Sequence, residues 1–369
     1  MKIVILFVFN FLICLVSFVD AQISNTAVID TSGGVKIKNV TIGGYLDNYY
    51  AYDFTSVKGN TIPYFVSSNL NNEFAINLGY IDFRYNTKSL RARIVPGFGT
   101  YMEANYVNEN GFFKSIIEAS VGVNLFKTKD IWLEVGVFGS PFTNESAISK
   151  DHFFYTRSLA PEYVPYYLAG MKLAIPMNEK WNIYFYLLNG WQQIKDQNSG
   201  KSLATQVEYR PTEKHLINWN TYVGDERSLY KPSYRYRYFS DIYWLYNISK
   251  KFSVISCLYG GIQQYLNGKN ILSSYYWWQV NTSCKWRFSD QYSMAFRVEY
   301  FNDLSNVMIS NLVSGYPVKI SALGLCFNKQ ISSNALIRLD GRFLHGQRPI
   351  YENLNQNTTI LTGNLTIWF

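Results

Sequence analysis

The sequence predicts an all-β fold, namely a transmembrane antiparallel up-and-down β-barrel of about 16 strands. Three observations predict it. The chain begins with an export signal, its apolar residues alternate with polar ones along short segments, and short polar turns alternate with long loops. Aromatic residues make up 18% of the chain, which suits a wall with Tyr and Trp at the membrane interfaces.

An export signal is expected over residues 1–21. Lys2 precedes an apolar run from Ile3 to Phe18, and the small residue Ala21 closes the segment. The run is shorter than the ~20 apolar residues of a spanning helix and contains Asn10. We therefore expect cleavage after Ala21 rather than a membrane anchor.

The mature chain then has a short N-terminal segment, periplasmic or lumenal, over residues 22–37 and a barrel over residues 38–369. Removing residues 1–21 takes away one base and one acid, so the net charge stays at +8. The basic residues are scattered, which does not indicate a nucleic-acid partner. The remaining cysteines, Cys257, Cys284 and Cys326, are odd in number and lack metal-ligand spacing, so neither a disulfide framework nor a metal site or other cofactor is expected.

Period-two alternation recurs from about residue 38 to the last residue. In residues 291–301 one face carries Tyr292, Met294, Phe296, Val298 and Tyr300, and the other carries Ser293, Ala295, Arg297, Glu299 and Phe301. Residues 131–138 and 335–344 alternate in the same way. Sixteen strands are predicted near residues 38–53, 74–87, 89–106, 113–127, 130–139, 166–177, 181–191, 201–211, 213–224, 236–249, 251–265, 270–287, 291–301, 317–328, 332–345 and 356–369.

The connections between these segments alternate in length. Short polar turns are predicted at 127–129, 177–180, 211–214, 249–251, 289–291 and 328–330, and long loops at 54–73, 140–165, 225–235, 302–316 and 346–355. Such alternation is typical of a membrane barrel, whose two rims differ. A soluble β-propeller or β-sandwich is the alternative, but no blade-like repeat is present and the apolar faces include Tyr and Trp.

The last strand resembles the signal that the outer-membrane insertion machinery reads. Apolar residues alternate from Leu361 and end on the aromatic Phe369, although Gly363 departs from the commonest register. The insertion machinery is thus an expected partner, together with outer-membrane lipid.

Three blocks of sequence resemble the OmpL-like family of β-barrel porins, which is widespread in Bacteroidota. They are Gly44-Tyr45-Leu46-Asp47-Asn48-Tyr49-Tyr50, the segment from Glu145 through Tyr155-Thr156-Arg157-Ser158-Leu159, and Leu188-Asn189-Gly190-Trp191-Gln192. Their order matches the family as well, and the resemblance runs from the first strand to Phe369. It implies an outer-membrane pore without a cofactor and names no solute.

Charged residues opposite the apolar faces are expected to line a wet lumen, because a base that faces lipid at the midplane costs ~2–4 kcal/mol. The predicted pore-lining residues are Asp82, Arg84, Arg91, Arg93, Glu134, Glu208, Arg210, Arg297, Glu299, Arg338, Asp340 and Arg342. Five arginines come from strands near the closure and several acids from other strands, which predicts a transverse field across the pore. The same charges can instead pair with one another as a structural lining, and both interpretations stay open.

Residues 139–165 are predicted to fold into the lumen as a constriction loop, because the segment is long and aromatic. Its charged residues are Glu145, Lys150, Asp151, Arg157 and Glu162. An outward-facing ordered lid is the alternative. In the inserted case, neutralising Arg157, Arg338 and Arg342 should shift selectivity toward cations, more than changing a rim charge such as Lys231.

The predicted function is a passive, water-filled, porin-like channel for small hydrophilic solutes or ions in the outer membrane of a Gram-negative bacterium. The alternative is a substrate-selective uptake channel, for example for saccharides, or a non-conducting surface-binding barrel. Tyr230, Tyr234, Tyr236 and Tyr238 could stack on glycans, or could equally form the rim of a strand. A homo-oligomer is left open.

An enzyme is not expected. The chain has three histidines, and His215 follows a predicted short turn, at the opposite rim from His152 and His345. No Gly-Xaa-Ser-Xaa-Gly motif, metal-binding His pair or phosphate-binding glycine loop is present.

Overall fold

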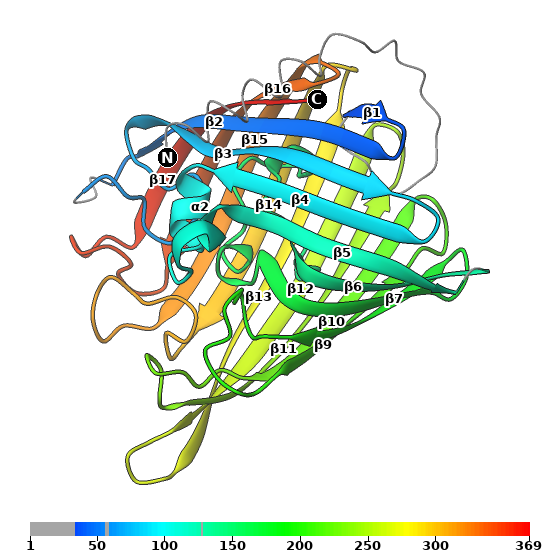
Figure 1. Cartoon of the computed structure of the whole chain (residues 1–369). Helices are drawn as coiled ribbons and strands as arrows, with labels where there is room; N and C mark the ends of the chain where they lie inside the picture. The colour runs from blue at the N-terminus through cyan, green and yellow to red at the C-terminus, as the bar shows by residue number, and fades with distance from the viewer. Residues whose placement is uncertain (1–33, 56–58, 127) are drawn as a thin grey trace.

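The wall of the molecule is one β-sheet that closes on itself. The computed structural model describes residues 34–55, 59–126 and 128–369, and within them sixteen antiparallel strands, β2 to β17, each pair with both neighbours. β9 pairs with β10, and β17 pairs with β2, so these strands leave no open edge (Figure 1). Closure lets each strand complete its backbone hydrogen bonds, as hydrocarbon surroundings require. The predicted architecture and strand number are confirmed.

The strands are β2 (Val40–Asp53), β3 (Glu73–Asn86), β4 (Leu90–Phe98), β5 (Ile116–Phe126), β6 (Lys129–Gly139), β7 (Tyr167–Pro176), β8 (Trp181–Leu188), β9 (Ser202–Tyr209), β10 (His215–Asp225), β11 (Tyr234–Asn247), β12 (Phe252–Leu266), β13 (Leu272–Arg287), β14 (Tyr292–Asp303), β15 (Val318–Ser332), β16 (Ala335–Gly346) and β17 (Asn357–Trp368). Short helical segments lie between them: α2 (Thr100–Asn105), η1 (Gly111–Ser115), η2 (Ser149–Asp151) and η3 (Pro161–Tyr163).

The seam of the barrel joins the first wall strand to the last. β17 pairs with residues 45–53 of β2, and Phe369 exchanges two backbone hydrogen bonds with Gly44, at 3.0 and 3.1 Å. Beyond the end of β17, the short strand β1 (Val35–Ile37) pairs with residues 40–42. The part of the N-terminal segment that the structure describes thus adds to the edge of β2, while the expected signal and cleavage site lie outside the described residues.

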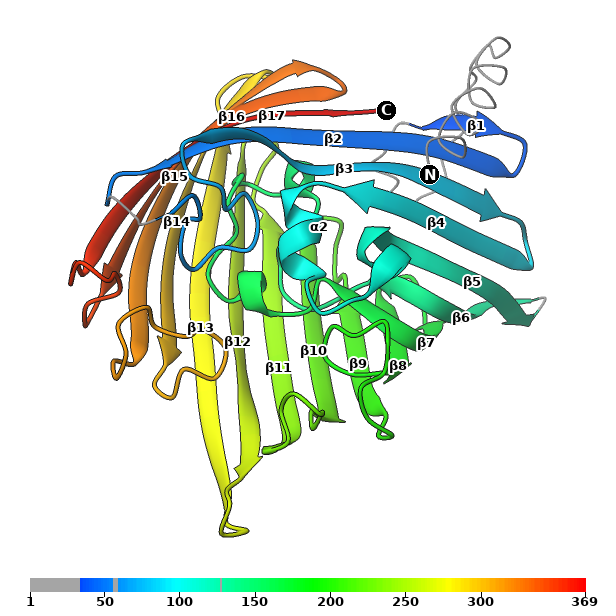
Figure 2. The same cartoon turned by 60° about the vertical axis from the view of Figure 1, so that its left-hand side comes forward.

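Two kinds of connection lie at opposite ends of the strands (Figure 2). The end with short turns, here called the turn end, includes residues 87–89, 177–180 and 333–334. The other, here called the loop end, includes 59–72, 99–115, 140–166, 189–201, 304–317 and 347–356. Alternation of turns and loops is as predicted.

Two strand limits differ from the prediction by four residues or more. The strand expected over residues 89–106 ends at Phe98, because Gly99 has a φ of 123° and its Cα lies against the carbonyl of Asn77, where a Cβ would approach the oxygen to 2.4 Å. The turn expected at 328–330 lies at 333–334. Asn328 faces inward and its amide donates to the carbonyl of Phe153 at 3.3 Å, so this polar stretch continues β15 instead of ending it.

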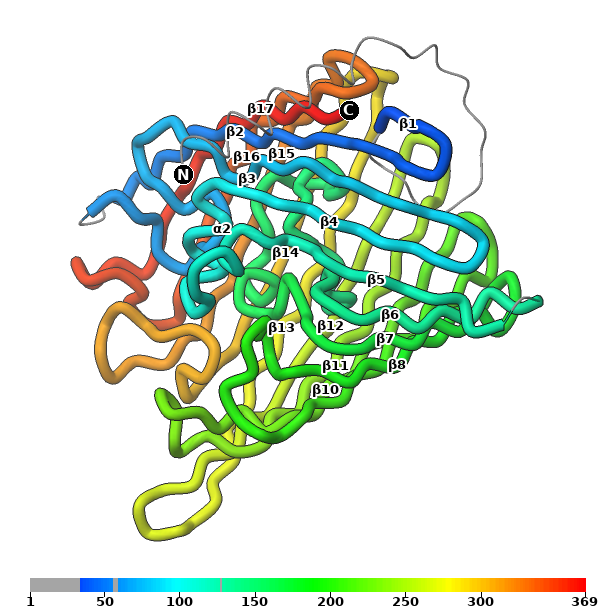
Figure 3. The backbone as a smooth tube through the Cα atoms, in the orientation of Figure 1, coloured from blue at the N-terminus to red at the C-terminus, as the bar shows by residue number. Residues whose placement is uncertain are grey.

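Side chains alternate between the two faces of the wall. Along β16 the outward residues Ile337, Leu339 and Phe343 are 40–51% exposed, whereas Arg338 and Arg342 point inward and are 1% exposed. Apolar residues therefore cover the outer surface and polar residues the inner one, as the period of two predicts. The tube view shows the chain between β6 and β7 running inside the ring of strands (Figure 3).

Candidate functional site

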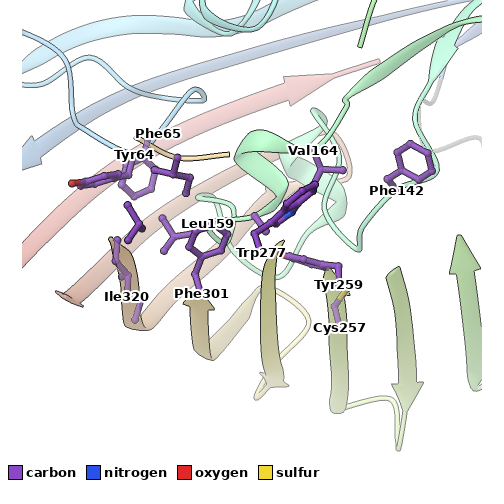
Figure 4. Packing of buried hydrophobic residues seen from close by; sticks show 14 of the residues in the cluster. Tyr64, Phe65, Phe142, Leu159, Val164, Cys257, Tyr259, Trp277, Phe301 and Ile320 are labelled. Atoms are coloured by element: carbon purple, nitrogen blue, oxygen red, sulfur yellow. The ribbon is translucent and has the colours of Figure 1, made fainter. Parts of the chain in front are cut away.

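The long loop between β6 and β7, residues 140–166 and here called the inner loop, occupies part of the lumen. Apolar loop residues pack against inward side chains of the wall: Leu159 and Val164 belong to the same buried cluster as Tyr259, Trp277 and Phe301 (Figure 4). These partners come from β12, β13 and β14. The loop therefore lies inside the ring of strands, against the wall of β10 to β17 and β2, and its role as a constriction stays a prediction.

Polar groups of the wall hold the backbone of the inner loop. The Asp340 carboxylate accepts hydrogen bonds from the backbone N–H groups of Tyr155 at 3.0 Å and Thr156 at 2.8 Å, and from the Thr156 hydroxyl at 3.0 Å. Glu299 accepts from the N–H of Leu159 at 2.8 Å. The backbone N–H groups of a loop have no neighbouring strand to bond with, so side chains of the wall accept their hydrogen bonds instead.

Two further wall residues act in the same way. The Gln279 amide oxygen accepts from the N–H of Ala160 at 2.5 Å, and Asp241 accepts from the N–H of Thr143. Sequence reasoning did not single out Gln279 or Asp241. Both lie in predicted strands, at positions that alternate with the apolar, outward residues. This alternation was the signal that could have identified them.

A chain of buried charges joins the loop to the wall. Glu145 of the loop pairs with Arg297 of β14 at 3.0 Å, and Glu299 pairs with Arg342 of β16. The arginines also donate to loop carbonyls, Arg297 to Thr156 at 2.8 Å and Arg342 to Arg157 at 2.5 Å. Arg297, Glu299 and Arg342 have side chains that are 1% exposed. Removing one partner of such a buried pair leaves the other charge buried without an opposite charge, which is strongly destabilising.

The tip of the loop is fixed near the seam. Arg338 donates to the backbone oxygen of Ser149 at 2.6 Å and to its hydroxyl at 2.7 Å, and that hydroxyl lies 3.1 Å from Asp47 of β2. Arg157 donates to carbonyls within the loop, those of Ser146 at 3.1 Å and Ala147 at 2.5 Å. Arg157 therefore braces the fold of the loop and faces the interior of the molecule.

Glu162 connects the inner loop to the first long loop. Its carboxylate accepts from the N–H groups of Val66 and Ser67, both at 2.9 Å, and burial raises its pKa. His152, also in the loop, accepts through Nε2 from the N–H of Ser146 at 2.8 Å. Burial lowers the pKa of His152 well below its ordinary value, so the docked loop holds a neutral imidazole.

The predicted bases on β3 and β4 are placed differently from the charged residues on β14 and β16, because their side chains remain partly exposed on the inner face, while Asp82 and Glu134 beside them are buried. Asp82 pairs with Arg84 at 2.6 Å and with Arg93 at 2.8 Å, and Arg91 pairs with Glu134 at 2.8 Å. The chain contributes two more charges here that sequence reasoning missed, Glu118 beside Arg93 at 2.7 Å and Lys172 beside Glu134. Both lie at inward positions of predicted strands.

Two predicted lumen residues lie further round the wall, on and just after β9. Glu208 accepts from the Tyr184 hydroxyl at 3.4 Å, and Arg210 follows the strand at the turn end. The predicted lumen residues that lie within strands are thus on the inner face of the wall, whereas Arg210 lies after the end of β9. Those on β14 and β16 are covered by the inner loop, and the bases on β3 and β4 stay partly exposed. Direct pairs such as Arg91 with Glu134 and Arg342 with Glu299 show that the alternative of a paired lining applies to these charges.

A family model described as "Putative beta-barrel porin-2, OmpL-like" matches residues 39–369. This chain belongs to that family of β-barrel porins. The resemblance seen in the sequence is confirmed, and the porin accordingly resides in the outer membrane. No curated protein sequence matches it.

Solved outer-membrane proteins share the fold of the porin. The channel DcaP of Acinetobacter baumannii has a TM-score of 0.61 at 8% identity, with 91% of this chain and 99% of that chain covered. An anion-selective porin from Comamonas acidovorans has a TM-score of 0.59 at 8% identity, with 89% and 99% covered. OmpT of Vibrio cholerae has a TM-score of 0.58 at 9% identity, with 92% and 100% covered. At these identities the likeness concerns the fold alone.

Other kinds of site find little support in the porin. Among residues 34–55, 59–126 and 128–369, no group of His, Cys, Asp and Glu is arranged to hold a metal ion, and no helix there is long and apolar enough to cross a membrane. Its family and fold are those of channel proteins rather than enzymes. Of the tyrosines considered for glycan stacking, Tyr236 and Tyr238 lie on β11 beside the inward Arg237 and face outward, whereas Tyr230 lies in a loop and is exposed.

Proposed function

We propose that this porin is a passive diffusion channel for small hydrophilic solutes or ions. The observation that carries the proposal is a closed barrel with a polar inner surface and a long loop seated inside it. Polar lumen groups can replace part of the hydration of a permeating solute, and an inserted loop narrows the path. The barrel thus combines a lining and a constriction.

The position of the inner loop defines where that path runs. The loop covers the inward residues of β10 to β17, whereas the bases on β3, β4 and β7 remain partly exposed on the inner face of the wall. On the loop itself, Ser146 and Asp151 are exposed. We therefore place the constriction between the exposed side of the loop and the wall formed by β3 to β9.

Planar bilayers test the channel directly. The refolded, heat-modifiable porin should give stepwise conductance. Uncharged solutes small enough to enter the narrow region should lower this conductance, and solutes too large to enter should leave it unchanged. A preparation that has been boiled serves as the control. Failure of the folded porin to conduct across a range of voltages and salts would contradict the proposal.

A second candidate is a saccharide-selective uptake channel, and Trp191 at the loop end favours it, because this half-buried ring is held by three buried aromatic residues. Trp191 lies within 4.9–5.9 Å of Phe142, Tyr222 and Phe239 between ring centroids, and the Arg237 guanidinium lies 4.9 Å from its ring. Aromatic surfaces next to a polar group are common in small-molecule sites. Swelling of proteoliposomes in saccharides but not in size-matched polyols would favour this candidate, and glycan binding without conductance would favour a non-conducting barrel.

We further propose cleavage after Ala21, delivery to the outer membrane and insertion guided by the strand that ends in Phe369. The apolar segment before Ala21 and the alternation along β17 support these steps. N-terminal sequencing of the porin from purified outer membranes should begin at Gln22. Recovery of the mature chain from culture medium, without membrane association, would contradict the proposal.

A further inference from the structure

A strip of charged residues crosses five neighbouring strands on the open side of the lumen. It consists of Asp82 and Arg84 on β3, Arg91 and Arg93 on β4, Glu118 on β5, Glu134 on β6 and Lys172 on β7. Ion pairs divide the strip into two clusters. Asp82, Arg84, Arg93 and Glu118 form one cluster, in which two bases balance two acids. The other cluster is a triad of Arg91, Glu134 and Lys172.

The triad carries one more positive than negative charge. Glu134 is shared between Arg91, with Nε 2.8 Å from the carboxylate, and Lys172. Arg91 reaches across β5 because Gly122 lies between the two strands: a Cβ there would lie 2.8 Å from Cγ of Glu134 and 3.0 Å from Cγ of Arg91. The wall is therefore shaped so that two cations meet at one carboxylate.

The excess charge faces the lumen. Arg91 and Lys172 have side chains that are 30% and 21% exposed, whereas the Glu134 side chain is 10% exposed. Aromatic rings support the two cations from the wall, Trp132 at 4.3 Å from Arg91 and Phe138 at 5.1 Å from Lys172. A solute next to the triad thus meets mainly positive charge, held in place by its surroundings.

The opposite wall does not offset this charge with free acids. Glu299 and Asp340 are buried among Arg297, Arg342 and the backbone of the inner loop. Other charged groups near this half of the lumen are mixed in sign: Asp151 lies beside Lys150, Glu208 and Arg210 lie on or just after β9, and Lys285 lies on β13. The triad is the cluster whose ion pairs leave an unbalanced cation at the lumen surface.

We propose that Arg91 and Lys172 form an anion-binding subsite, which makes the channel prefer small anions such as chloride or short carboxylates. The proposal rests on the conducting function proposed above. A carboxylate or halide at the triad supplies the second negative charge that Glu134 alone does not provide. Fixed charges on a wall of low dielectric concentrate the opposite ion in the pore.

Reversal potentials in a KCl gradient test this preference. The unmodified porin should favour chloride over potassium, and Lys172→Gln should lower the chloride-to-potassium permeability ratio about ten- to twenty-fold. One unit charge ~5 Å from the ion in a water-like dielectric changes the permeability about four-fold for each ion, in opposite directions for the two. Glu134→Gln should change the ratio in the opposite direction. Lys231→Gln removes the same charge from an exposed loop and should leave the ratio unchanged. A preference for potassium, or a ratio that Lys172→Gln does not alter, would overturn the subsite.

A second measurement does not depend on conduction. Crystals of the porin grown in bromide should show an anomalous peak between Arg91 and Lys172, and this peak should be lost in Lys172→Gln. If the folded porin fails to conduct but the peak is present, the channel function is wrong and the anion subsite stands. If it conducts but shows neither the peak nor the chloride preference, the subsite is wrong and the channel function stands.

Discussion

Replacing Asp340 by alanine should release the inner loop from the wall without unfolding the barrel. The carboxylate accepts two backbone N–H groups, those of Tyr155 and Thr156, which no rotation can redirect, and a threonine hydroxyl, which can turn toward another acceptor. Leaving a buried donor unpaired costs about 1–3 kcal/mol. Two such donors give about 4 kcal/mol, which lowers the ratio of docked to undocked loop about a thousand-fold at 1.4 kcal/mol per decade.

Single-channel recording measures the outcome, because an undocked loop leaves a wider and less steady path. Asp340→Ala should show larger, noisier conductance steps than the unmodified porin, and Asp340→Asn should lie between them because its amide oxygen still accepts from the same donors. Leu339→Ala, on the outward face next to Asp340, is the control and should conduct as the unmodified porin does. Heat modifiability verifies that each barrel is folded. A folded Asp340→Ala barrel with unmodified conductance and noise would refute the reasoning.

Three other perturbations probe the same architecture. Deleting residues 144–158 should enlarge the conductance of a folded, heat-modifiable barrel, and unchanged conductance and selectivity would mean that the loop does not form the constriction. Burial lowers the pKa of His152, so docking is strongest above the ordinary His pKa of about 6.5 and weakens as the pH falls below it, by at most about 1.4 kcal/mol per pH unit. The raised pKa of Glu162 makes docking stronger on acidification and so acts in the opposite sense. The current noise should therefore be recorded in Glu162→Gln, where it should rise from pH 7.5 to pH 5.5. Adding His152→Gln to this variant should abolish the rise. Gly44→Leu should lower the temperature at which heat modifiability is lost, because even a Cβ there would lie 2.3 Å from the Phe369 ring; an unchanged temperature would contradict this packing.

The sequence predicted the wall well because each strand shows its inward and outward faces locally. The alternation around Arg297 and around Arg338 predicted which residues of these two strands face inward and where the strands lie, and the structure agrees for both strands. Arg338 and Arg342 were expected to act directly on ions, but they are covered by loop contacts. Their effect on selectivity stays a prediction, and the position of the loop must be measured together with it.

Contacts between distant segments could not be read from the sequence. The pairing of Glu145 with Arg297 joins residues 152 positions apart, and neither residue carries a local signal for the other. The exposure of Lys172 depends on where the inner loop lies, which in turn depends on the sum of many buried polar contacts. Period-two patterns give the face of a residue, whereas its partner is a property of the folded lumen.

The wall residues that seat the inner loop bind mainly its main chain. Asp340, Glu299, Gln279 and Asp241 accept from backbone N–H groups, which every residue except proline provides. The exposed side chains of the loop, such as those of Ser146 and Asp151, can therefore vary in evolution or in a designed library while these backbone contacts are retained. Substitutions at exposed positions of the loop can therefore change the permeability of the pore while the barrel wall stays the same.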